Sequence, residues 1–90
     1  MSTNNTIESI QITPLNFPIN GLVAFALVKY AGLILSSIGI YTLKNESGYR
    51  ITYPTKKAKD HDMNIFNPYD KEVSEMLERE IIKKYKQLYE

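Results

Sequence analysis

A run of 23 residues from Gly21 to Leu43 carries a single charge, at Lys29. Because a membrane-spanning helix needs about 20 mostly apolar residues, this run is long enough to cross a bilayer. Lys29 would then lie in the hydrocarbon, where it costs about 2.5–3.5 kcal/mol near the centre. The run therefore permits either a small membrane protein or a domain in which the run folds back on itself.

The residues around Lys29 favour the second possibility. Lys29-Tyr30-Ala31-Gly32 separates two segments of strand length, Leu22–Val28 and Leu33–Leu43, and a glycine supplies the backbone freedom of a turn. Both segments are rich in β-branched and aromatic residues, which suit a pleated sheet better than a helix. We therefore expect a β-hairpin here, with a membrane span as the less favoured alternative.

The flanking segments extend this hairpin into a sheet. We expect a first strand at Thr6–Thr13, a loop from Pro14 to Gly21, a polar turn at Lys44–Gly48 and a short strand at Tyr49–Tyr53. Thr55–Asp62 has the composition of a charged loop, and Met63–Phe66 has that of a possible fifth, edge strand.

After Asn67-Pro68 the apolar period changes from 2 to 3.6, which predicts a helix capped by Asn67 or Asp70. Its apolar face consists of Leu77, Ile81, Tyr85 and Leu88, with Val73 at the edge. The predicted fold class is α+β, with an antiparallel sheet of four to five strands and one C-terminal amphipathic helix. We expect a single domain over residues 1–90, with residues 1–5 flexible.

Composition narrows the classes of function. The net charge is +1, so the chain as a whole has no strong attraction to polyanions, and the absence of cysteine excludes thiol chemistry. The one histidine, His61, lies between Asp60 and Asp62, and no glycine-rich phosphate loop opens a helix. We expect no enzymatic activity, cofactor, metal or small-molecule substrate. The polar N-terminal segment lacks a secretory signal, which favours a cytoplasmic protein.

Several short motifs, in this order, resemble the stage V sporulation protein G (SpoVG) family of bacterial septation and sporulation regulators. They are Gly21-Leu22-Val23-Ala24, Ile38-Gly39-Ile40, Gly48-Tyr49-Arg50-Ile51-Thr52-Tyr53-Pro54, Lys56-Lys57, Asn64-Ile65-Phe66-Asn67-Pro68 and Ile81-Ile82-Lys83-Lys84-Tyr85. The resemblance implies a small α+β homodimer that binds DNA or RNA. Leu22 and Gly39 stand where the family has arginines, so this chain is less basic than its relatives.

Two groups of cations are candidates for contact with phosphates. The first is Lys56, Lys57 and Lys59, which include the basic pair of the family; the second is Arg79, Lys83 and Lys86 on the polar face of the predicted helix. Charged side chains that only solvate the surface would give the same patterns. A protein-interaction or structural module without nucleic-acid binding therefore stays open as the alternative function.

The two long strands are apolar on both alternations, whereas a sheet with one solvated face should alternate between apolar and polar. One helix can cover only one face, so we expect a second copy of the chain to cover the other. The residues assigned to this dimer interface are Val23, Phe25, Leu27, Leu33, Leu35 and Tyr41.

Overall fold

The computed structural model describes residues 7–43 and 48–90. Its elements are β1 (Ile7–Ile19), β2 (Leu22–Tyr30), β3 (Leu33–Thr42), β4 (Tyr49–Thr52), β5 (Thr55–Ala58), β6 (His61–Asn64) and α1 (Lys71–Tyr89). Strands β1 to β4 form an antiparallel sheet in the order β1-β2-β3-β4, and β5 pairs with β6 in a separate two-stranded sheet. The predicted α+β fold class and the hairpin of β2 and β3 are confirmed. Residues 1–6 and the predicted turn residues 44–47 lie outside the described part.

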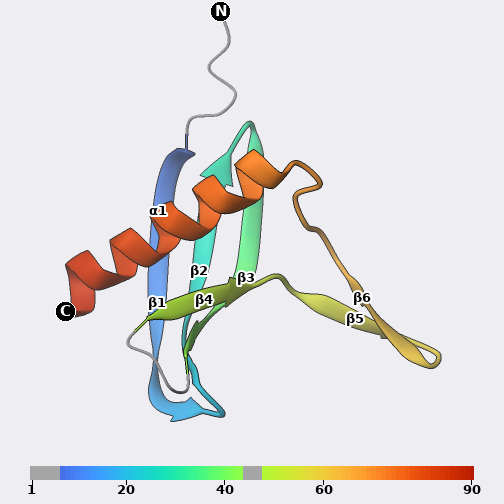
Figure 1. Cartoon of the computed structure of the whole chain (residues 1–90), viewed down its shortest axis with the longest axis horizontal. Coiled ribbons are helices and arrows are strands. Elements are labelled where there is room, and N and C mark those ends of the chain that lie inside the picture. Colours follow the sequence, from blue (N-terminus) through green and yellow to red (C-terminus); the bar gives the residue numbers. More distant parts are fainter. Residues whose placement is uncertain (1–6, 44–47) are drawn as a thin grey trace, which may run out of the picture.

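Helix α1 crosses one face of the four-stranded sheet, as Figure 1 shows. Asp70 caps the helix, since its Oδ1 accepts a hydrogen bond of 2.9 Å from the backbone N–H of Glu72. Leu77 and Ile81 are the buried residues of its apolar face, whereas Leu88 is 50% exposed. Leu88, which the helical period assigns to this face, is therefore not part of the core. Within the described residues, no helix has the length and apolar character needed to cross a membrane.

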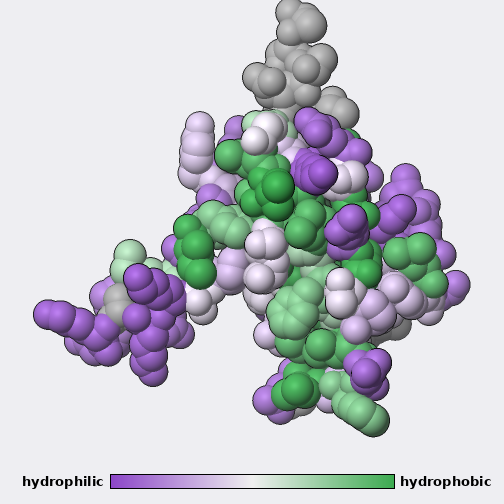
Figure 2. Space-filling view, turned by 180° about the vertical axis from the view of Figure 1, so that it is seen from behind, coloured by the Kyte–Doolittle hydropathy of each residue, from purple (hydrophilic) through white to green (hydrophobic). Residues whose placement is uncertain are grey.

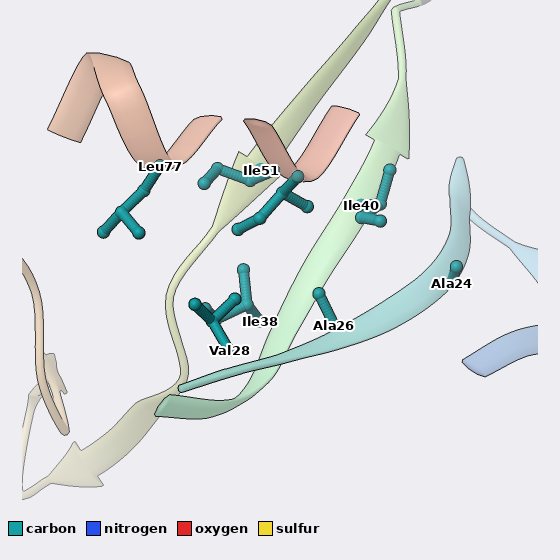
Figure 3. Packing of buried hydrophobic residues seen from close by; sticks show 8 residues of the cluster. Ala24, Ala26, Val28, Ile38, Ile40, Ile51 and Leu77 are labelled. Carbon is teal, nitrogen blue, oxygen red and sulfur yellow. The ribbon is translucent and has the colours of Figure 1, made fainter. Parts of the chain in front are cut away.

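The core lies between α1 and the central strands. The buried side chains are Ala24, Ala26, Val28, Ile38, Ile40, Ile51, Leu77 and Ile81, and Figure 3 shows how they gather. Ala24 and Ala26 occupy little volume on β2, which leaves room for the isoleucines of β3 and of the helix. Fully burying one leucine or isoleucine contributes about 1.5–3 kcal/mol, so this cluster is the main source of stability.

Three predicted boundaries were wrong. Strand β1 continues through Pro14 and Pro18 to Ile19, where a loop was expected. Proline is tolerated there because β1 is an edge strand. The predicted charged loop at Thr55–Asp62 is largely the hairpin of β5 and β6. The fifth strand, predicted at Met63–Phe66, is β6, and it pairs with β5 instead of the main sheet.

A bulge in β3 decides which side chains face the helix. Ala26 pairs with Ile38 and Val28 pairs with Leu35, so β3 has one more residue than β2 between these pairs. Ser37 in this bulge has a positive φ of 63°. The extra residue reverses the alternation, and Leu35 therefore packs against the same core as Ile38.

Candidate nucleic-acid interface

The hairpin of β5 and β6, which we call the arm, projects from the side of the molecule (Figure 1). Its turn consists of Lys59 and Asp60, and Lys59 adopts a positive φ of 53°. All described side chains from Thr55 to Asn64 are exposed. Lys56 and Lys57 are thus presented on a strand of a two-stranded ribbon, and Lys59 is presented in its turn.

The register of the arm separates Lys56 from Lys57. Lys56 pairs with Met63, and Lys57 pairs with Asp62. Because successive side chains on a strand point to opposite faces, Lys56 and Lys57 lie on opposite faces of the ribbon. Directly opposed residues share a face, so the carboxylate of Asp62 offsets part of the charge of Lys57. The Lys56 face is therefore the more positive of the two.

None of the described residues forms an ion pair with Lys56, Lys57 or Lys59. His61 is less free, because its Nδ1 lies 3.4 Å from Oδ1 of Asp60. The lysine ammonium groups are consequently available to an external anion without breaking an interaction within the protein. Long, flexible side chains of this kind suit contacts with phosphates, which need charge more than fixed geometry.

The second candidate group lies on the exposed side of α1. Nε of Arg79 is 3.3 Å from Oε2 of Glu80, so this guanidinium already has an acidic neighbour. Nζ of Lys86 lies 5.9 Å from the centre of the Tyr49 ring, a cation–π contact. Lys83 is exposed and takes part in none of the ion pairs of the described residues. Arg79 and Lys86 are therefore less available than the arm lysines, whereas Lys83 is, within the described part of the chain, as free of ion pairs as they are.

Tyr49 on β4, the residue that Lys86 contacts, also attaches the C-terminal end of α1 to the sheet. The Tyr49 hydroxyl donates a short hydrogen bond to Oε2 of Glu90, and the Tyr49 and Tyr85 rings meet edge to face at 5.1 Å. The hydrogen bond to Glu90, together with desolvation, raises the pKa of Tyr49 to about 12. Tyr49 thus remains protonated at neutral pH, and it has a structural contact instead of a free aromatic face for base stacking.

The two basic groups are not brought together in one protomer. Figure 1 shows the arm beyond the N-terminal end of α1, whereas Lys83 and Lys86 belong to the C-terminal half of the helix. A single short stretch of nucleic acid would therefore meet one group or the other. Both groups are exposed, and the arm group is the less engaged within the described part of the protein.

The predicted dimer residues divide between the two faces of the sheet. Leu35 and Val23 pack against the core cluster, and Leu33 lines a groove with Leu35 and Leu77. The assignment of Leu33 and Leu35 to the uncovered face was wrong, because the β3 bulge reverses the alternation. Phe25, Leu27 and Tyr41 remain candidates for that face.

The uncovered face is also partly closed by its own side chains. A Cβ atom at Gly39 would lie 3.0 Å from Oγ1 of Thr52 and 3.1 Å from Leu22 and Tyr41, so these side chains converge over the glycine. Phe25 on this face is 37% exposed. Figure 2 views the molecule from this side and shows apolar residues mixed with paler, more polar ones over the sheet. The part of this face around Gly39 is therefore covered by the chain's own side chains.

Further apolar side chains, which the sequence pattern did not reveal, are exposed on the arm and near its base. They are Leu33, Met63, Ile65 and Tyr69, with exposed fractions from 53% to 100%. Leu33 and Tyr69 line an open groove of about 400 Å³ between the end of the β2–β3 hairpin and the start of α1. Only the segment Asn64-Ile65-Phe66-Asn67-Pro68 at the arm's end, which breaks the strand pattern, could have drawn attention to it.

Among the described residues, no three histidine, cysteine or carboxylate side chains gather as ligands of a metal ion. Comparisons of the chain with protein-family models, with curated proteins and with solved structures found no match.

Proposed function

We propose that this protein is a non-enzymatic bacterial regulator of the SpoVG type, which acts in the cytoplasm as a homodimer and binds DNA or RNA through the lysines of the arm. The observation that carries the proposal is the arm itself. It presents Lys56, Lys57 and Lys59 away from the body of the protein, exposed and without ion-pair partners among the described residues. The order of the SpoVG-like motifs, which include Lys56-Lys57, supports the same function.

Binding of this kind should be strongly salt-dependent. If the three arm lysines of each chain in a dimer neutralise about six phosphates, the slope of log K against log salt should be near −5 for duplex DNA. The measurement is a titration of the purified protein with random-sequence DNA and RNA at two salt concentrations. Absence of binding to both at low salt would contradict the proposal.

One observation favours the alternative, a protein-interaction module without nucleic-acid binding. The exposed apolar residues near the base of the arm suit a protein surface better than phosphates. In that case the titration shows no binding, while the protein still associates with itself or with another protein through this surface.

A further inference from the structure

The arm lacks the packing that a hairpin of this size needs. All of its described side chains are exposed, and β5 and β6 pack on no other element to a substantial extent. A two-stranded hairpin alone is at best marginally stable in water, and three or more strands are usually needed. Exposed Met63 and Ile65 add an apolar surface to this unpaired ribbon. The arm is therefore a candidate for pairing with a further strand.

The free hydrogen-bonding groups of the arm follow from its register. The backbone N–H of Ile65 donates to the carbonyl of Pro54 at 2.8 Å, so these two residues form a hydrogen-bonded pair. Hydrogen-bonded and non-hydrogen-bonded pairs alternate along an antiparallel ladder. Since Lys57 pairs with Asp62 and Thr55 with Asn64, these are the non-hydrogen-bonded pairs. On the outer edge of β6, the backbone N–H and C=O groups that point away from β5 are therefore those of Asp62 and Asn64.

Charge distinguishes the two outer edges. On the outer edge of β5, the backbone groups that point away from β6 are those of Thr55 and Lys57. If Thr55 of one copy paired with Lys57 of the other, Lys56 would lie opposite Lys56 of the second copy. Like charges directly opposed across strands are destabilising. Pairing Asp62 of one β6 with Asn64 of the other instead places Met63 opposite Met63, with no like charges opposed. The edge of β6 is the one suited to a second copy.

We propose that two copies of this chain associate through antiparallel pairing of β6 with β6, with Met63 at the two-fold axis and Asp62 opposite Asn64 of the other copy. The two arms then form one four-stranded ribbon, with the lysines of both β5 strands on its outer edges. In this register the turn residues of each arm lie opposite Phe66 and Asn67 of the other copy. Phe66 and Asn67 line the apolar groove together with Asp70. This pairing shares the homodimer with the proposed function but does not depend on nucleic-acid binding.

The chain has no cysteine, so a single introduced thiol tests this register. In a non-hydrogen-bonded antiparallel pair the Cα atoms are about 4.5 Å apart, within the range that a disulfide needs. Met63→Cys should therefore convert to a disulfide-linked dimer under mild oxidation without nucleic acid. The measurement is non-reducing gel electrophoresis over time.

Asp62→Cys is the matched control, because the thiol is equally exposed on the adjacent residue. The two residues 62 would be offset by two positions, which places their Cα atoms roughly 8 Å apart, beyond disulfide range. Asp62→Cys should stay mostly monomeric while Met63→Cys cross-links. Equal rates for both variants, or faster cross-linking of Phe25→Cys on the uncovered sheet face, would overturn the proposal.

A second variant tests the pairing without a thiol. Asn64→Pro removes an N–H that points away from β5, so the bonds within the arm are kept while pairing with the second copy is blocked. We expect light scattering to give a dimer for the original chain and a monomer for Asn64→Pro, with the same circular dichroism. A folded Asn64→Pro variant that remains a dimer would overturn the proposal. Because no nucleic acid is present, these results are independent of those that test the proposed function.

Discussion

Replacing Lys56 and Lys57 together by glutamate should abolish nucleic-acid binding and leave the fold intact. The change removes two exposed positive charges per chain and adds two negative ones, so phosphates are repelled where they were attracted. The core should not be affected, because the buried residues all come from β2, β3, β4 and α1. Filter binding or fluorescence anisotropy at low salt gives the affinity, and circular dichroism checks the fold.

Lys83→Glu with Lys86→Glu is the matched control, since it makes the same change of charge on α1. We expect a much smaller loss of affinity in this variant. Single replacements by glutamine refine the result, and Lys56→Gln should cost more affinity than Lys57→Gln, because Asp62 already offsets the charge of Lys57. A charge-reversed arm with unchanged affinity, alongside a strong loss from the helix variant, would assign binding to α1.

Replacing Ile81 by alanine should have the largest effect on stability. Ile81 is fully buried beneath α1 among the core residues of the sheet, so truncation leaves a cavity. Large-to-small changes of this kind cost about 2–5 kcal/mol, a large part of the total stability of a domain this size. Urea unfolding followed by circular dichroism should show a lower midpoint with a similar slope.

Ile34→Ala on β3 is the control for this change, because the side chain removed is the same and is 64% exposed. Its effect should be within about 0.5 kcal/mol, as for most surface substitutions. Similar losses in the two variants would mean that α1 does not cover the sheet as described.

The sequence was most informative where the local pattern and the tertiary environment agree. The hairpin of β2 and β3 has apolar strands and a glycine in its turn, and helix α1 has a capping residue and a periodic apolar face; both were predicted. Leu88 fits the same helical period, but it is half exposed near the helix end. Periodicity shows which face a residue occupies and not whether another element lies opposite.

The errors in the sheet have physical causes that the sequence shows only weakly. Pro14 and Pro18 normally signal a loop, and an edge position is what allows β1 to continue past them. The bulge at Ser37 adds a single residue to β3, yet this reverses the faces of Leu33 and Leu35. The arm has little apolar content and no glycine or asparagine in its turn, so its strands resemble a charged loop.

The candidate site was predicted in part. Lys56, Lys57 and Lys59 were identified as residues, and the structure adds that they lie on a ribbon whose two faces differ in charge. Their separation from Arg79, Lys83 and Lys86 depends on the packing direction of α1, which no local pattern reveals. The apolar surface near Met63, Ile65 and Tyr69 was not predicted, because single apolar residues in a polar segment carry no periodic signal.

The most direct test of the arm as the nucleic-acid contact is a map of backbone amide chemical shifts during titration with a short random-sequence duplex or single strand. The largest changes should fall on Thr55 to Asn64, with Lys56 and Lys59 among them, and Arg79 to Lys86 should change little. Changes confined to Arg79–Lys86, or none anywhere at low salt, would contradict this prediction.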